Sequence, residues 1–511
     1  MSRLDNAKNG IIAGVINNIL NILLPFVSRT IIIYTLGNAY TGLGGLFTSI
    51  INVLNISELG FGAAVSYILY KPIAEKDDEK VRAILNFTRK CFRVIGLVIL
   101  VAGLAVMPFL KHLIKSDVPD GLNIYILFVI YLANVATSYM TFAYKRLLFS
   151  ANQRYDVETK IASVVLVCQN ILQILILLVL RNYYLYVAAF LVMTLVNNIL
   201  CHITTRKMFP QYFCQGEIQR EEVKTLKQKI GGSFFAKVGE TIYLSVGNIV
   251  ISAFFGLVVL GKYGNYYYVI SSLVMLFAVL HNTLRPIIGN CIVLEGKETN
   301  FQRLQTLTHG YMWAAAFCTC CLLTLYQDFI TVWVGADGLF PLEIVILLAV
   351  YFFVGRLACV PVLFVEAAGL WWESKFFSLI SAAVNLVLGI ALSSTIGLPG
   401  ILISSIVSSL AVTLYGYVKV LFKHYFNEKG QLKRYLVSTA GVAVGGAAVA
   451  VLVCLVLTRV PAGSWVMLVV KGALVVAVFA VAYFLVNWKN KDARSAWRIV
   501  QKMFLSKLKR S

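Results

Sequence analysis

The sequence predicts an all-α polytopic membrane protein of about fourteen transmembrane helices, since roughly 20 apolar residues cross a hydrocarbon core about 30 Å thick. Composition is the first observation behind this prediction: 59% of the 511 residues are hydrophobic, 13% are charged, and the mean hydropathy is +0.81. The number of long apolar stretches is the second observation, and an internal repeat is the third. Inside lipid every backbone N–H and C=O must be satisfied within its own segment, so these stretches are predicted as helices.

The apolar stretches divide the chain into parts. They lie near 10–34, 42–69, 91–113, 122–142, 159–180, 183–204, 231–256, 260–289, 309–333, 341–368, 374–395, 398–422, 436–457 and 463–487. We therefore predict a six-helix N-terminal lobe, a charged cytoplasmic linker, a six-helix C-terminal lobe, an appended helix pair and a basic cytoplasmic tail, at 1–204, 205–230, 231–422, 423–487 and 488–511.

The two predicted lobes share sequence features at nearly equal displacements. Three glycines that follow the first apolar stretch recur 219 residues later: Gly37, Gly42, Gly45 and Gly256, Gly261, Gly264. A polar motif recurs 215 residues later: Glu158, Thr159, Lys160, Ser163, Asn170 and Glu373, Ser374, Lys375, Ser378, Asn385. A duplicated set of six helices in parallel orientation is a transporter design, with the substrate site where the halves meet. Transport is therefore the leading hypothesis.

The basic charge of the chain is distributed like that of a membrane protein. The formal net charge is +22, from 45 Lys and Arg against 23 Asp and Glu. With the N-terminus placed in the cytoplasm, most basic residues fall in cytoplasmic loops and tails, which is the positive-inside pattern. We therefore expect both termini in the cytoplasm and no nucleic-acid partner. The basic tail indicates either a helix on the anionic inner leaflet or a solvated segment.

Several motifs of enzymes and metal proteins are absent from the sequence. There is no G-x-x-x-x-G-K-[ST] loop for ATP, no H-E-x-x-H motif and no nucleophile elbow. The ten cysteines lie mostly within or beside apolar stretches and lack zinc spacing. We therefore expect no catalytic residue, no metal site and no bound cofactor. The energy for transport would come from the membrane potential, from a gradient of Na⁺ or H⁺, or from the substrate's own gradient.

The first two apolar stretches carry polar residues at three- and four-residue steps, which places them on one helix face. They are Asn17, Asn18, Asn21, Ser28 and Arg29 in the first stretch, and Thr48, Asn52, Asn55, Glu58 and Ser66 in the second. An ionisable group inside the bilayer normally faces a partner or a wet cavity. Two facing stripes therefore predict an aqueous cavity in which Arg29 could pair with Glu58. For the asparagines, hydrogen bonds that merely hold the helices together are an equal alternative.

Arg356 is the strongest candidate for a substrate-binding residue. It lies near the middle of its stretch and ten residues before Glu366, which is about 15 Å along a straight helix. A direct salt bridge between the two is therefore not expected, and Arg356 needs another carboxylate or an anionic substrate. A guanidinium suits a phosphate because it donates paired hydrogen bonds and stays charged.

Other ionisable residues in later stretches are candidates of the same kind. Lys237 and Arg285 are predicted cavity cations, although both lie near the cytoplasmic interface and could instead extend into it. Glu240 and Glu366 are predicted to line the cavity or to couple transport to an ion. The sequence does not decide whether His281 and Lys471 are functional, and Lys471 has no evident partner.

With these features in place, the chain resembles the polysaccharide transporter family, the Wzx-type oligosaccharide flippases of the multidrug/oligosaccharidyl-lipid/polysaccharide (MOP) exporter superfamily. The resemblance rests on the order of Pro25–Arg29, Leu36–Phe47, Asn55–Gly62 and Ala151–Arg154, and on the six-plus-six-plus-two helix count. It implies two lobes that form a V and open alternately to each side of the membrane. By position, Arg29 matches the cavity cations that engage pyrophosphate and sugar in such families.

The resemblance also implies a substrate and a location. We expect a monomer in a bacterial plasma membrane that moves undecaprenyl-pyrophosphate-linked oligosaccharide from the inner to the outer leaflet, for capsule or exopolysaccharide biosynthesis. A polysaccharide polymerase and glycosyltransferases are candidate partners. The alternatives are a lipid II flippase and a MATE-like cation-coupled drug antiporter, whose cavity would favour carboxylates and aromatics. A membrane polymerase or glycosyltransferase is disfavoured because the outer loops are too short for a catalytic domain.

Overall fold

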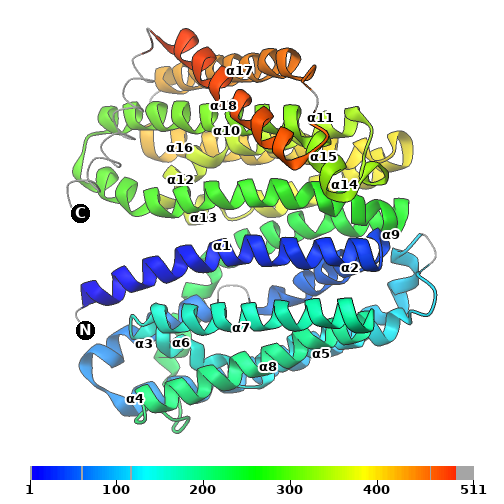
Figure 1. Ribbon diagram of the computed structural model, residues 1–511. Helices are drawn as coiled ribbons and strands as arrows, with labels where there is room; N and C mark the ends of the chain where they lie inside the picture. The colour runs from blue at the N-terminus through cyan, green and yellow to red at the C-terminus, as the bar shows by residue number, and fades with distance from the viewer. Residues whose placement is uncertain are drawn as a thin grey trace. The chain divides into compact units, whose positions relative to one another are not determined.

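The computed structural model describes residues 3–58, 61–115, 118–427, 429–460, 462–488 and 490, so nearly all of the predicted basic tail lies outside the described residues. The described chain is built from helices without any strand (Figure 1). The prediction of an all-α membrane protein is therefore confirmed. By its internal contacts the chain divides into two compact units, Met1–Gly264 and Asn265–Ser511.

The first unit consists of long helices joined by short turns. Its elements are α1 (Arg3–Thr35), α2 (Asn38–Leu54), η1 (Asn55–Glu58), α3 (Phe61–Glu75), α4 (Asp78–Val106), η2 (Met107–Leu113), α5 (Ile124–Met140), η3 (Ala143–Lys145), α6 (Arg146–Ala151), α7 (Tyr155–Leu175), η4 (Ile176–Leu180), α8 (Tyr183–Met208) and the part of α9 (Arg220–Leu294) up to Gly264. Helix α1 packs along α7, and α5 packs against both α4 and α8 (Figure 1).

Short polar side chains set the starting points of several of these helices. The Asp77 carboxylate accepts from the N–H of Lys80 at 3.0 Å before α4, and the Asn123 amide oxygen accepts from the N–H of Tyr125 at 3.0 Å before α5. Asn182 caps α8 in the same way. The first N–H groups of a helix have no intrahelical partner, so a side chain that accepts from them stabilises that end.

Two glycines at corresponding positions of the repeat break the helices in the same way. Gly37, between α1 and α2, has φ 98° and ψ 173°, and Gly256, inside α9, has φ 83° and ψ 176°. Residues that carry a side chain rarely adopt such a positive φ, so glycine is required at both places. The repeat seen in the sequence is thus present in the backbone as well.

Two further glycines of the repeat let backbones touch. An added Cβ at Gly42 would lie 2.0 Å from the carbonyl oxygen of Leu257, and an added Cβ at Gly261 would lie 2.0 Å from that of Asn38. Asn38 and Leu257 are themselves 219 residues apart, like the two glycines. The contact between α2 and the segment after Gly256 is therefore symmetric, and it uses small residues as close helix packing in membranes does.

The second unit is built around α10 (Figure 1). Its elements are the rest of α9, α10 (Lys297–Val334), η5 (Ala336–Gly338), α11 (Leu342–Leu357), α12 (Cys359–Ala367), α13 (Trp371–Ser374), α14 (Phe377–Ile396), α15 (Pro399–Ser408), η6 (Ser409–Leu414), α16 (Tyr415–Leu421), η7 (Phe422–Phe426), α17 (Lys429–Leu457) and α18 (Trp465–Asn487). Helix α10 packs on α11, α17 and α18, and α14 packs on α15.

The number of membrane-spanning helices depends on how the breaks are treated. Within the described ranges, 11 helices are long and apolar enough to span, or 12 if α5 and α6, which are bent by 49°, form one span. Two differences from the predicted number have clear causes. The merged helix α9 covers two predicted spans with a break at Gly256, and α2 and α3, with 17 and 15 residues, are each too short to qualify alone.

A buried ion pair holds α18 against α10. The Nζ atom of Lys471 lies 2.6 Å from Oδ2 of Asp328, and the exposed fractions of the two side chains are 3% and 30%. The partner that the sequence left open for Lys471 is thus Asp328, 143 residues earlier in the chain.

We expect Lys471→Met to lower the thermal stability of the purified protein more than the double variant Lys471→Met/Asp328→Asn does. Removing only the lysine leaves a partly buried carboxylate without its counter-charge, which costs more than removing both charges. A double-mutant cycle on the unfolding free energy should give a coupling of about 1–3 kcal/mol. Purely additive effects would show that the pair does not hold α18.

Candidate functional site

The polar stripe of α1 is anchored on α7. The hydroxyl of Ser28 donates to Oδ1 of Asn170 at 2.7 Å, and both side chains are buried. Asn21 is exposed and donates to the carbonyl oxygen of Asn17 at 2.8 Å, while Asn18 is half-buried. Ser28 therefore holds α1 to α7, a role that the sequence analysis allowed only for the asparagines of the stripe.

Arg29 lies against the glycines of the repeat. Its Nη2 donates to the carbonyl oxygen of Gly261 at 3.2 Å, and an added Cβ at Gly264 would lie 2.5 Å from the same nitrogen. A hydrogen bond to a carbonyl oxygen orients a guanidinium without removing its positive charge. The repeat glycines thus provide both the acceptor and the space for this cation.

Glu58 has a different partner from the one expected. The hydroxyl of Tyr139, on α5, donates to Oε2 of Glu58 at 2.5 Å. In the described part of the chain no ion pair joins Glu58 to Arg29, so that predicted pairing is not present. The neighbouring residues of the stripe differ in burial, since Asn52 is exposed and Asn55 is half-buried with an Oδ1 atom that has no hydrogen-bond partner among the described residues.

The first part of α9 carries two predicted site residues that are exposed. They are Lys237 and Glu240, three residues apart on the helix. Their exposure suits the alternative in which a long basic side chain extends to the interface.

In the second unit three predicted or flagged residues form one cluster. Oε2 of Glu366, on α12, lies 3.1 Å from Nε2 of His281 and 3.5 Å from Nη1 of Arg285, both on α9. His281 and Arg285 are one helical turn apart, so they face α12 together. The guanidinium of Arg285 also lies 5.0 Å from the ring centroid of Trp371. The carboxylate of Glu366 thus brings an imidazole and a guanidinium of α9 together on one side of α12.

Arg356 stands apart from that cluster. Its Nε atom is buried without a hydrogen-bond partner among the described residues, and its guanidinium lies 5.7 Å and 5.6 Å from the ring centroids of Phe277 and Phe352. No ion pair between Arg356 and another described residue is present. Aromatic faces attract a cation, but they offer no acceptor for its N–H groups.

The break between α11 and α12 follows directly after Arg356. Helix α11 ends at Leu357 and α12 begins at Cys359, with Pro361 inside α12. A proline has no N–H, so the bond that residue 361 would donate to the carbonyl of Leu357 is missing. The helix is thus broken just before Pro361, between Arg356 and Glu366.

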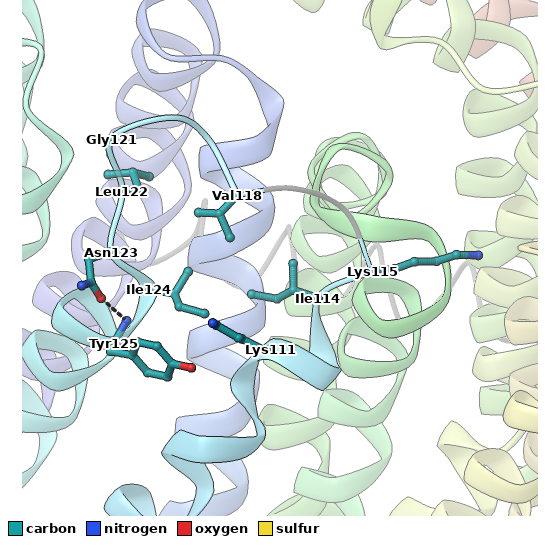
Figure 2. Close-up of a pocket in the computed structure, with 9 residues that line it drawn as sticks. All are labelled: Lys111, Ile114, Lys115, Val118, Gly121, Leu122, Asn123, Ile124 and Tyr125. Atoms are coloured by element: carbon teal, nitrogen blue, oxygen red, sulfur yellow. Dashed lines mark hydrogen bonds between the residues drawn. The ribbon is translucent and has the colours of Figure 1, made fainter.

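A hollow of about 650 Å³ lies between η2 and the start of α5. Figure 2 shows Lys111 beside Tyr125, and Lys115 pointing away from both. The ammonium of Lys111 lies 5.9 Å from the ring centroid of Tyr125, and Asn123 bonds the N–H of Tyr125 as the cap of α5. The two lysines are exposed, so none of the described residues that line this hollow carries a buried charge.

Another hollow, of about 330 Å³, lies among α1, α5, α6, α7 and α8 of the first unit. Most of its lining side chains are amides and hydroxyls, among them Asn17, Asn21, Gln169, Thr194, Asn197 and Asn198. Of these, the sequence pattern singled out only the residues on α1.

Sequence reasoning missed residues whose partners are distant along the chain. Tyr139 and Asp328 are polar residues inside apolar stretches, which was an available signal, but nothing in the sequence tied them to Glu58 and Lys471. Asn170 was found through the repeat. In the part of the chain that the structure describes, no three His, Cys, Asp or Glu side chains are grouped to hold a metal ion.

Comparison with solved structures places the fold among membrane transporters. The lipid II flippase MurJ in an inward closed conformation has a TM-score of 0.67 at 14% identity, covering 94% of this chain and 98% of that chain. An inward-facing multidrug resistance MATE family transporter of the MOP superfamily has a TM-score of 0.61 at 13% identity, covering 79% and 94%. The Vibrio cholerae MATE transporter VcmN has a TM-score of 0.56 at 13% identity, covering 83% and 99%.

Comparison by sequence adds nothing further, because no protein-family model and no curated protein matches this chain. The three structural likenesses extend over most of this chain and nearly all of each matched chain. The chain therefore has the all-α membrane fold that is seen in MurJ and in MATE transporters of the MOP superfamily.

Proposed function

We propose that this protein is a flippase that moves a polyprenyl-pyrophosphate-linked oligosaccharide from the inner to the outer leaflet. The observation that carries this proposal is Arg356, a charged group inside a helical unit whose buried Nε has no hydrogen-bond partner among the described residues. A cation in such a place is stabilised when an anion binds. The paired donors of a guanidinium match phosphate oxygens, so a pyrophosphate headgroup is a suitable anion.

The fold supports a transport role. Among the matched proteins, MurJ is a lipid II flippase, and MATE transporters of the MOP superfamily occur in inward-facing and outward-facing conformations. A fold that opens to either side suits alternating access to a site inside the membrane. This mechanism needs no nucleotide, and an ion gradient or the membrane potential would drive it.

Lipid II and a cationic drug are the two alternative substrates. A lipid II flippase would also carry a lipid-linked pyrophosphate, and MurJ covers 94% of this chain against 79% for the inward-facing MATE transporter. This broader likeness favours a lipid-linked headgroup over a drug. A cationic drug would also be repelled by the charge of Arg356, which has aromatic rings around it and no carboxylate bonded to it in the described residues.

The orientation of the chain agrees with this substrate. The excess of basic residues in the predicted cytoplasmic loops favours both termini in the cytoplasm of a bacterial cell. Such an orientation lets the substrate load from the inner leaflet, where glycosyltransferases would complete it. A polymerase would then consume it at the outer leaflet.

The proposal is tested by reconstituting the protein in vesicles with a fluorescent undecaprenyl-pyrophosphate-linked oligosaccharide. We expect the protein to speed movement of the labelled headgroup between leaflets relative to protein-free vesicles. Lipid II and a fluorescent organic cation serve as competing substrates in parallel samples. Preferred transport of either competitor, or elongation of the glycan by the purified protein, would replace the proposed function with the corresponding alternative.

We expect Glu366→Gln to remove the dependence of flipping on an imposed proton gradient. The substitution keeps the shape of the side chain but deletes the charge that holds His281 and Arg285, so the cluster can no longer exchange a proton between carboxylate and imidazole. The measurement is the flipping rate with and without a pH difference across the vesicle. Glu343→Gln, at an exposed residue of α11, is the matched control. A proton-gradient dependence that survives Glu366→Gln would show that this cluster does not couple transport.

A further inference from the structure

One side chain that lines the hollow among α1, α5, α6, α7 and α8 has a buried acceptor without a donor among the described residues. Asn198 on α8 is 1% exposed, and its Nδ2 donates to the carbonyl oxygen of Ser138 at 3.3 Å and to Oγ1 of Thr141 at 2.6 Å. A carbonyl oxygen can only accept, so the atom facing Ser138 must be the NH₂ group of the amide. The Oδ1 atom is therefore the one left buried without a hydrogen-bond partner among the described residues.

A second amide in the same hollow is in a similar state. Oδ1 of Asn197 is also buried without a described partner. A buried acceptor without a donor is costly, so both side chains gain free energy when they turn their oxygens toward a ligand in the hollow that donates hydrogen bonds. By contrast, Oδ1 of Asn17 in the same lining already accepts from the hydroxyl of Ser163 at 3.0 Å.

The charge of the hollow selects against ions. Among the described residues that line it only Arg146 is charged, and its Nε lies 3.1 Å from Oε1 of Glu158. None of the described lining residues has a carboxylate to attract a cation, and the unpaired amide oxygens would repel an anion. A neutral ligand rich in O–H groups satisfies the lining best.

The size and place of the hollow agree with such a ligand. Its volume of about 330 Å³ lies at the small end of the range of roughly 300–1,000 Å³ for ligand sites, which suits a single sugar ring. Ser138 lies near the last residue of α5, and Asn197 and Asn198 lie in the second half of α8. The hollow thus lies toward the end of the unit where α5 and α8 finish, which is the cytoplasmic side in the proposed orientation.

We infer that this hollow is a pocket for one neutral sugar residue of the transported glycan, with Asn197 and Asn198 accepting hydrogen bonds from its hydroxyls. This inference rests on the proposed function, because the lipid-linked substrate supplies the glycan. It assigns recognition of the sugar to the first unit. The pocket would therefore determine which glycans are transported. It would not affect transport of the lipid carrier without a sugar.

The test compares two fluorescent lipids in reconstituted vesicles, undecaprenyl-pyrophosphate-linked oligosaccharide and undecaprenyl pyrophosphate without sugar. Asn197→Leu and Thr194→Val remove polar groups of the lining with little change in volume. We expect each variant to raise the apparent KM for the glycosylated lipid about three- to tenfold, the loss expected for one hydrogen bond, with kcat and transport of the bare lipid unchanged. Thr205→Val on the same helix is the control, because that hydroxyl bonds the carbonyl of Cys201 in its own helix at 2.8 Å.

The outcomes separate this inference from the proposed function. If the wild-type protein flips both lipids and the variants change neither KM, the pocket assignment is wrong and the flippase stands. If the wild-type protein flips neither lipid, the proposed function fails, and binding of the released oligosaccharide to wild type and Asn197→Leu then decides the pocket: equal binding, or none by the wild type, overturns it. Displacement of the oligosaccharide by a fluorescent organic cation would identify a drug pocket instead.

Discussion

Replacing Arg356 by alanine should lower the flipping rate of the lipid-linked oligosaccharide by about a hundredfold, since hydrogen bonds to charged groups contribute roughly 1.5–3 kcal/mol and 1.4 kcal/mol is a factor of ten. The guanidinium lies against Phe277 and Phe352, and its buried Nε has no acceptor among the described residues. A bound pyrophosphate would supply that acceptor. The measurement is the initial rate in vesicles at saturating and at low substrate.

Two further variants separate the specific role of Arg356 from the general effect of removing a positive charge. Arg356→Lys keeps the charge but loses the planar fork, so it should recover only part of the rate. Arg459→Ala removes an exposed arginine from the turn after α17 and should leave the rate unchanged. A normal rate in Arg356→Ala, with normal protein folding, would remove this residue from the site and with it the main support for an anionic substrate.

Replacing Gly42 by alanine should prevent stable folding or lower the unfolding free energy by at least about 3 kcal/mol, the upper part of the range for an overpacked contact. The added Cβ would lie 2.0 Å from the carbonyl oxygen of Leu257 and 2.9 Å from its carbonyl carbon. Both atoms belong to the backbone, so the clash is relieved only if α2 and α9 move apart. Yield and thermal unfolding of the purified protein measure the effect.

Gly45 is the matched control for this substitution. It lies three residues further along α2, and no atom lies within 4 Å of a Cβ added there. Alanine is the better helix former by roughly 0.5–1 kcal/mol, so Gly45→Ala should be neutral or stabilising. Gly261→Ala should behave like Gly42→Ala because the contact is symmetric. Equal stability of the Gly42 and Gly45 variants would show that this close contact does not occur.

The predictions that succeeded from sequence rest on local chemistry. The long apolar stretches forced helices because lipid offers no partner for the backbone, and this logic found every long helix of the described chain. The glycine repeat indicated a duplication, and the structure shows a positive φ at Gly37 and Gly256, which excludes residues with a side chain there. The bounds of the helices within the stretch 42–69 were less well defined, because this stretch is interrupted between α2 and α3. Hydropathy does not detect such a short loss of helical geometry.

The predicted site residues were found from the free-energy cost of placing a charge in lipid. This cost identifies the charged residue but not the group that compensates it. A charge in lipid needs compensation, and this singled out Arg356, Glu366 and Lys471. Which group compensates each of them depends on which helices pack together. Glu366 is matched by two residues of α9, and Lys471 by Asp328 on α10. The lining of the sugar pocket escaped notice because Asn197 and Asn198 carry no charge and fit an apolar stretch.

From composition and periodicity alone, this protein could be assigned a helical membrane fold, an internal duplication and a set of costly buried charges, since each follows from the immediate surroundings of a residue in lipid. The packing of the helices decided which of those charges are neutralised within the protein and which lack an acceptor among the described residues. Partners such as Asp328 and Lys471 are far apart in the chain, and hydropathy contains no information about which helix faces meet.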